Sequence, residues 1–306
     1  MELFIAIFTG TIIAATPLIF AALGELVVEK SGVLNLGIEG MMLMGAAVAF
    51  WAVTAGYSMP VAILAGALAG AATSLLFGVL ALTFLTNQYA AGLALAIFGS
   101  GVSAFIGRGF GSEPIKALPG ANIPVLSDLP VLGPLLFRFD PLVYVALLMF
   151  TAISWFLYRT KAGLILRTVG ESPQTSHAIG YPVIRIRYMA VLFGGLMAGL
   201  AGAYLSVAYT PLWVENMTAG KGWIALALVV FATWRPLRIL LGAWLFGGMT
   251  ILQLQGQALG LRVPSEVLSA LPYLATIVVL VVISRNRQML ALHFPASLAK
   301  PFRPAG

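Results

Sequence analysis

The sequence contains no cysteine and very few charged side chains. Aspartate, glutamate, lysine and arginine make up 9% of the 306 residues, whereas about 25% is usual in soluble proteins. The absence of cysteine excludes disulfides, cysteine-ligated metal clusters and thiol catalysis. Because 60% of the residues are hydrophobic, too few polar side chains remain to cover a water-soluble particle. The composition predicts an all-α integral membrane protein with one transmembrane domain over residues 1–306.

Signatures of catalysis and of nucleotide binding are also missing from the sequence. No GxxxxGK[ST] motif is present, so there is no P-loop for a nucleotide. The two histidines, His177 and His293, are far apart in sequence, which does not indicate a metal site. We expect a chain that is not an enzyme and that binds no metal or cofactor of its own.

Nine apolar segments approach the length of about 20 residues that a membrane-spanning helix needs. They are residues 3–23, 34–55, 61–85, 90–106, 142–158, 188–209, 222–234, 239–253 and 268–284. Two of them, 222–234 and 239–253, are short, and 34–55 carries the polar residues Asn35 and Glu39. The sequence therefore predicts a polytopic helical bundle of eight or nine transmembrane helices with broken or re-entrant segments.

The basic residues are concentrated in three of the connections between these segments. The loop 159–187 holds five basic residues and one acid, the turn 235–238 holds two arginines, and the tail 285–306 holds four basic residues and no acid. Lysine and arginine accumulate in cytoplasmic loops, so we expect these three regions in the cytoplasm. The balanced loop 107–140 and the N-terminus are then expected outside. The net charge of +7 thus reflects membrane topology and does not indicate nucleic-acid binding.

Polar and aromatic residues within or beside the apolar segments are candidates for a solute path. Asn35 and Glu39 are four residues apart and share one face if the chain is helical there. They either line the path or tie neighbouring helices together. Asn87 and Gln88 join two apolar segments, where they form either a broken helix facing a cavity or an ordinary surface turn. Trp223, next to an outer loop, is either a path residue or an aromatic residue of the membrane interface.

The basic loop 159–187 contains the signals of one short helix. Ser172 is a good N-cap residue, Pro173 suits the first helical position, and Gly180 suits the position just after the end. The pattern predicts a helix over residues 173–179, exposed in the cytoplasm between two membrane spans.

Glycines recur at small-xxx-small spacing in two of the apolar segments. Gly66 and Gly70 form one such pair, and Gly195 and Gly199 form another. This spacing lets helix backbones approach closely in lipid. We interpret it as general helix packing and not as a specific dimer surface.

Two stretches of the sequence resemble a known family. Glu29-Lys-Ser-Gly-Val-Leu-Asn35 with Gly37-Ile-Glu-Gly-Met-Met42, and the loop Leu166–Val183 with its Gly-Glu-x-Pro core, resemble permease subunits of ATP-binding-cassette importers. The group is the one that transports branched-chain amino acids, simple sugars or nucleosides. The Glu-Gly-Met-Met version looks most like the nucleoside-uptake branch.

The resemblance implies a multi-pass permease subunit in the bacterial cell (inner) membrane that is driven by ATPase subunits, which would bind ATP and magnesium. It implies a second, related permease subunit, an extracytoplasmic solute-binding protein, and contact with membrane lipid. It also implies that the short cytoplasmic helix docks on the ATPase. The residues carried over to this coupling role are Gly170, Glu171, Pro173, His177 and Gly180.

Two alternatives remain open from the sequence. One is a permease of the same group for simple sugars or branched-chain amino acids. The other is an ion-coupled secondary transporter, for which Glu39 is the plausible titratable residue, although it lies near one end of its apolar segment.

Overall fold

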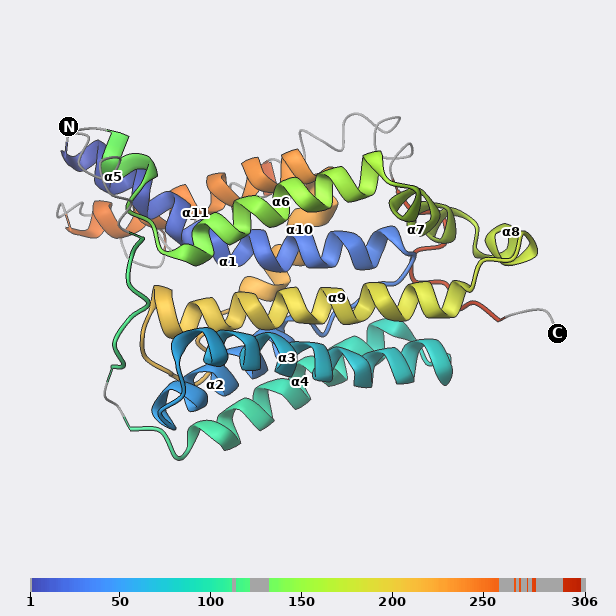
Figure 1. The fold of residues 1–306 in the computed structure, drawn as a ribbon, viewed down its shortest axis with the longest axis horizontal. Helices are drawn as coiled ribbons and strands as arrows, with labels where there is room; N and C mark the ends of the chain where they lie inside the picture. The colour runs from blue at the N-terminus through green and yellow to red at the C-terminus, as the bar shows by residue number, and fades with distance from the viewer. Residues whose placement is uncertain are drawn as a thin grey trace.

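The chain forms an elongated bundle of helices in a computed structural model. The structure describes residues 2–111, 114–121, 132–258, 267, 270, 274, 277–278 and 294–303. Throughout this part of the chain every regular element is helical. The long helices run side by side along the long axis of the molecule (Figure 1). The predicted class, a polytopic helical membrane protein, is confirmed.

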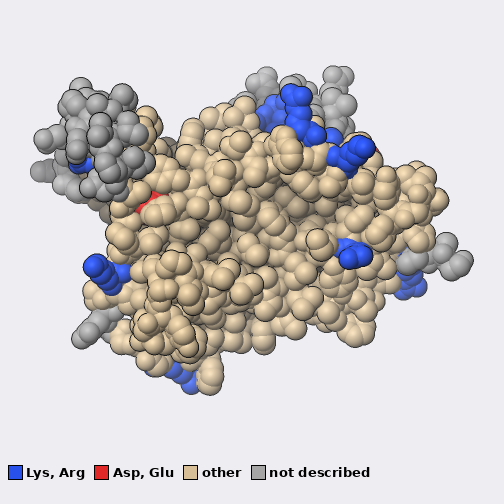
Figure 2. Space-filling view, viewed as in Figure 1, with Lys and Arg blue, Asp and Glu red and all other residues tan. Residues whose placement is uncertain are grey.

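Six of the described helices are long and apolar enough to cross a membrane. They are α1 (Glu2–Lys30), α3 (Met59–Gly78) with its π-helical end η1 (Val79–Thr83), α4 (Gln88–Gly107), α6 (Pro141–Arg159), α9 (Val183–Tyr204) with its π-helical end η2 (Leu205–Tyr209), and α11 (Pro236–Ala258). On the face seen in Figure 2, one group of lysine and arginine lies at the left end of the bundle and another lies over the half toward the opposite end, with a band free of lysine and arginine between them. This distribution fits a bundle whose middle lies in hydrocarbon.

Two shorter apolar helices, α2 (Ile38–Thr54) and α10 (Lys221–Phe231), begin inside the bundle. At 1.5 Å per residue α10 is only about 17 Å long, roughly half of a hydrocarbon core. The expected interruption of segment 34–55 is confirmed, because residues 31–37 are not helical. The segment 239–253 is not short, since α11 begins at Pro236 and has 23 residues.

The two ends of the bundle carry different small elements. At one end, the α8 end, lie the helices α7 (Lys161–Glu171) and α8 (Pro173–Ala178) (Figure 1). At the other, the α5 end, lie α5 (Leu132–Leu136) and the start of α1. The predicted helix 173–179 is confirmed to within one residue, while α7 is an additional helix within the loop 159–187 that the local signals did not predict.

Parts of three predicted regions lie outside the described residues. The ninth predicted span, 268–284, falls there almost entirely, as does much of the tail 285–306. Of the loop 107–140, the structure describes 107–111, 114–121 and 132–140. Within it, Ile115 N donates to Pro211 O at 2.9 Å, so this loop pairs with the segment that follows η2.

The most buried of the six long helices is α9, which lies against α3 through glycine. A Cβ added to Gly199 would overlap Gly66 O and lie 2.9 Å from the Cα of Gly70. A Cβ added to Gly195 would lie 2.7 Å from Gly70 O. The two small-xxx-small pairs therefore face each other within one chain, as expected for general helix packing.

Candidate functional site

Glu39 joins the first turns of the two short helices. It is the second residue of α2, and its side chain reaches the start of α10. Oε1 accepts hydrogen bonds from Thr218 Oγ1 at 2.5 Å and from Gly220 N at 2.9 Å, and Oε2 accepts one from Gly222 N at 2.6 Å. The first N–H groups of a helix have no partner inside the helix and attract a carboxylate. Glu39 is therefore a clamp between α2 and α10.

This clamp lies near the middle of the bundle. The residue after Glu39, Gly40, packs so closely on α4 that an added Cβ would lie 2.6 Å from Leu95 O. Leu95 and Ala96 are seven and eight residues into α4, which corresponds to roughly 10–12 Å of its roughly 30 Å length. Glu39 lies near one end of its apolar segment in the sequence. In space it is central, because α2 starts only after the interruption has led the chain into the bundle.

An open groove of about 560 Å³ adjoins the clamp. Its lining includes Glu39, Ala96, Ser100, Gly101, Asn216 and Trp223. Ser100 Oγ donates to Asn216 Oδ1 at 3.0 Å, and 36% of the Trp223 side chain is exposed. Of the five candidate path residues, the structure brings Glu39 and Trp223 together in this groove.

Asn35 lies in the interruption and not in the groove. It is 1% exposed, its Oδ1 accepts from Gly37 N at 2.9 Å, and its own N–H donates to Glu25 Oε1 at 3.2 Å. Asn35 and Glu39 would share one face only if the chain were helical from one to the other, and this condition is not met because Asn35 precedes α2. Its side chain instead bonds to the backbone two residues on, as in an Asx turn.

Asn87 and Gln88 lie at the α8 end of α4, away from Glu39. Asn87 is the N-cap of α4, with Oδ1 accepting from Ala90 N at 3.1 Å. Gln88 is 3% exposed, and its Oε1 accepts from Leu34 N at 2.9 Å. One residue therefore caps a helix, and the other supplies a partner to the backbone of the interruption.

The candidate coupling residues divide into an inner and an outer set. An alanine Cβ at Gly170 would overlap Lys30 O, and Gly170 O accepts from Ser297 N at 3.0 Å and from Ser297 Oγ at 2.6 Å. Pro173 is buried as well. These two residues therefore pack α7 and α8 against the bundle, whereas Glu171, His177 and Gly180 are exposed.

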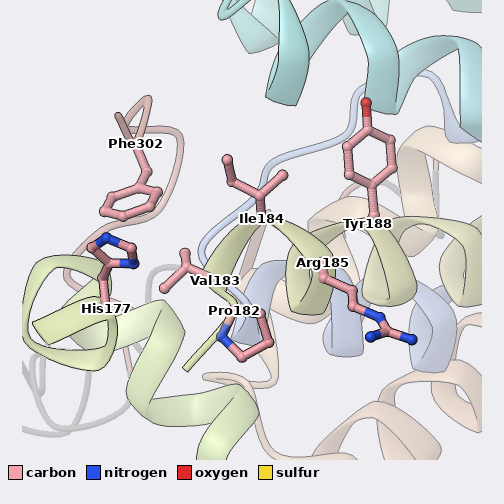
Figure 3. A pocket seen from close by; sticks show the side chains of 7 residues that line it. All are labelled: His177, Pro182, Val183, Ile184, Arg185, Tyr188 and Phe302. Carbon is pink, nitrogen blue, oxygen red and sulfur yellow. The ribbon is translucent and has the colours of Figure 1, made fainter. Parts of the chain in front are cut away.

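An apolar hollow of about 540 Å³ lies beside α8 (Figure 3). The ring of His177 stands edge-on to Phe302, with 5.7 Å between the ring centroids. Tyr188 directs its hydroxyl toward η1, where it hydrogen-bonds Thr83 Oγ1 at 2.6 Å. Ile179, directly after α8, is 66% exposed. The α8 end thus presents an apolar tip next to a hollow between α8, α9 and the chain terminus.

Arg187 is a structural residue that the sequence analysis did not single out. It is 1% exposed, and its guanidinium donates to Ser31 O at 3.1 Å, to Ser297 Oγ at 3.0 Å and to Lys300 O at 3.3 Å. It thereby joins α9, the end of α1 and the C-terminal segment 294–303. Nothing in the sequence distinguishes Arg187 from the other basic residues of its loop.

A second contact that the sequence did not predict connects α1 with the turn that follows α10. Trp234 Nε1 donates to Glu29 Oε2, and both side chains are almost fully buried. The first predicted span ends at residue 23, but α1 continues to Lys30 and carries Glu29 into the bundle. The two acidic residues Glu25 and Glu29 interrupt the apolar pattern, so hydropathy alone does not predict that α1 extends to Lys30.

Comparisons with known proteins identify the family. Residues 7–283 match the model of the branched-chain amino acid transport system permease component. The chain is 40% identical to a putative glucose ABC transporter permease, TsgC13, of Haloferax volcanii, over 96% of both chains. It is 34% identical to the nucleoside ABC transporter permease NupC of Lactococcus lactis over 90% of both chains, and 33% identical to the guanosine permease NupQ of Bacillus subtilis over 89% of both.

No solved structure matches this chain. The family match nevertheless covers nearly all of the sequence, and the three relatives named above each exceed 30% identity. The chain belongs to the permease-component family of branched-chain amino acid transport systems, and it is an ABC transporter permease component.

Proposed function

We propose that this chain is the permease subunit of an ATP-driven importer for nucleosides in a bacterial inner membrane. The Gly37–Met42 run with its Glu-Gly-Met-Met sequence supports this solute class, as does the similarity to the nucleoside permease NupC and the guanosine permease NupQ. The chain forms one part of the translocation path and contains no ATP site of its own. Solute moves by alternation between outward-open and inward-open states, whose populations ATP hydrolysis shifts.

The observation that carries this proposal is the capped helix α8 at one end of the bundle. Ser172 caps it, Pro173 anchors it, and Ile179 presents an apolar side chain at its tip. The basic loop 159–187 lies at this end, which supports a cytoplasmic α8 end. An exposed apolar side chain on a short rigid element suits docking on an ATPase subunit that binds ATP and magnesium.

The remaining partners follow from the same proposal. A second, related permease completes the path. The proposal is supported by NupQ and NupP of Bacillus subtilis, which are both guanosine ABC transporter permease proteins and are 33% and 26% identical to this chain. An extracytoplasmic solute-binding protein delivers the solute to the α5 end, where the described parts of the loop 107–140 lie. The C-terminal segment 294–303 lies at the α8 end, and the proposal assigns it to the cytoplasm together with α8.

Simple sugars are the second candidate solute class. The 40% identity to a putative glucose permease over 96% of both chains favours them. The two classes are separated by reconstituting the purified complex with its binding protein and measuring ATP hydrolysis and uptake with adenosine, glucose and leucine. We expect stimulation by adenosine. Stimulation by glucose alone would show that the solute is a simple sugar and not a nucleoside. Uptake driven by an ion gradient without ATP would refute the proposal of an ATP-driven importer.

The docking role of α8 is tested with the variant Ile179→Asp. A buried interface anchor commonly contributes 1 kcal/mol or more, so we expect about a tenfold loss of co-purifying ATPase, the equivalent of about 1.4 kcal/mol. The matched control is Leu136→Asp, an exposed apolar residue of α5 at the opposite end. Equal ATPase retention in the two variants would refute the docking role.

A further inference from the structure

We propose that the groove beside Glu39 is the solute-contact site of this chain and that Trp223 stacks on the base of a nucleoside there. This inference rests on the proposed function and deepens it. The groove is bounded by α2, α4, the segment 210–220 and α10. Its volume of about 560 Å³ lies within the usual range for a small-molecule site, roughly 300–1,000 Å³.

The depth of the groove argues against lipid as its occupant. Glu39 and Ala96 lie near the middle of the bundle, and Ser100 lies one helical turn further toward the α5 end of α4. Glu39, Ser100 and Asn216 present carboxylate, hydroxyl and amide groups to the open space. Polar and ionised side chains at this depth face water, a pathway or another protein chain, because hydrocarbon does not solvate them.

The exposed surface of α3 and α4 outside the groove differs in chemistry. It carries large apolar side chains such as Leu64, Leu68, Leu93 and Phe105, which are 45–71% exposed. Such side chains suit lipid contact. The polar groups of the groove therefore stand out against an apolar surrounding, and they indicate where a hydrophilic solute passes.

The hydrogen-bonding groups that remain available fit a neutral solute with hydroxyl groups. A carboxylate offers about four acceptor positions, and the clamp uses three on Glu39. Within the described part of the chain, Asn216 accepts from Ser100 through Oδ1, and its amide nitrogen has no recorded partner. A ribose hydroxyl can donate to Glu39, and another can accept from Asn216.

Trp223 supplies the surface for the base. It is 36% exposed and lines the groove directly after Gly222, the last residue of the clamp. Stacking of a nucleobase on an aromatic side chain is tolerant of base identity, because every base has a π face. The pair of features, one aromatic face and two polar groups beside it, matches a nucleoside better than an amino acid, whose charged groups need separate partners.

Gly101 allows the groove to be blocked without disturbing the fold. A Cβ added to Gly101 meets nothing within 4 Å, so a larger side chain there extends into open space. The test measures ATP-driven adenosine uptake by reconstituted complexes in the presence of the binding protein. Complexes that contain the wild-type chain, Gly101→Leu or Gly109→Leu are compared. Gly109 is the matched control, because its added Cβ would have its nearest neighbour at 4.0 Å and it lies outside the groove lining. We expect uptake to fall about tenfold only in Gly101→Leu.

The stacking role is tested in the same assay with Trp223→Ala, Trp223→Phe and the control Trp155→Ala. Trp155 is 63% exposed on α6 and does not line the groove. We expect adenosine uptake to fall about fivefold or more in Trp223→Ala, the equivalent of about 1 kcal/mol, and to be largely retained in Trp223→Phe and Trp155→Ala. Phenylalanine restores an aromatic face, so its retention separates stacking from loss of folding.

The outcomes distinguish this inference from the proposed function. Wild-type adenosine uptake that persists unchanged in Gly101→Leu and Trp223→Ala would overturn the groove assignment and leave the nucleoside importer standing. Absence of adenosine uptake by the wild-type complex would overturn the proposed solute class, and with it the stacking role. Loss of uptake in Trp223→Phe equal to that in Trp223→Ala would contradict base stacking.

Discussion

Replacing Gly199 with alanine tests the close contact between α3 and α9. The added Cβ would overlap Gly66 O and lie 2.9 Å from the Cα of Gly70, whereas an ordinary van der Waals contact lies at 3.4–4 Å. The helices must therefore separate locally by at least about 0.5 Å. Overpacking of this kind costs about 1–3 kcal/mol. Because α9 is central to the bundle, the separation also disturbs the other helices that pack on α9. We therefore expect the free energy of unfolding to fall by an amount at the upper end of that range.

The measurement is the free energy of unfolding of the purified chain in detergent, or its midpoint temperature at fixed detergent and lipid. The matched control is Gly248→Ala in α11, where the added Cβ would lie 3.5 Å from Thr11 Cγ2, an ordinary contact. Alanine is favoured over glycine within a helix by about 1 kcal/mol, so we expect this control to be neutral or stabilised. A Gly199→Ala chain as stable as the Gly248→Ala chain would refute the close-contact argument.

Two further substitutions test the clamp and the junction at the α8 end. Glu39→Gln replaces one hydrogen-bond acceptor of the clamp by a donor, which costs about 1–3 kcal/mol of local stability. We therefore expect hydrogen exchange at the backbone amide of Gly222 to accelerate about tenfold. Glu215→Gln, an exposed acid in the preceding segment, is the control, and equal exchange in the two would contradict the clamp. Arg187→Lys keeps the positive charge, but an ammonium group cannot reproduce the three hydrogen bonds of the planar guanidinium. The C-terminal segment 294–303 is then held less firmly, and we expect its proteolysis to accelerate about tenfold. The exposed Arg185→Lys is its control, and equal cleavage rates would contradict the junction.

The long helices and α8 follow from local signals in the sequence. Apolar runs of about 20 residues locate spanning helices, because hydrocarbon selects length and composition. Ser172, Pro173 and Gly180 locate α8, because caps act within one turn of the chain. The polar pair Asn35 and Glu39 correctly indicates an interruption in the second apolar segment. In each case the determining physics involves residues that are neighbours in sequence.

The site residues were less predictable, because their roles depend on contacts between distant segments. Glu39 meets residues about 180 positions later, and Arg187 meets a segment more than 100 positions later. The depth of Glu39 depends on how far the interruption carries the chain before α2 begins. Trp223 lies beside an outer loop in sequence, and only the re-entry of segment 210–220 brings it to Glu39. The spacing of residues along the chain does not predict which distant segments meet in the folded protein.

The interruptions explain why so few of the polar candidates lie in one path. Backbone that is not helical inside a membrane protein needs partners that lipid cannot supply. In the first interruption, Gln88 accepts from Leu34 N and Glu25 accepts from Asn35 N. In the second, Glu39 accepts from the N–H groups of Gly220, the N-cap of α10, and of Gly222 in its first turn. A polar residue in an apolar run is therefore first a sign of irregular backbone nearby. It becomes a candidate for solute contact only where it also borders open space, a condition that Glu39 meets and that Asn35, which is buried, does not.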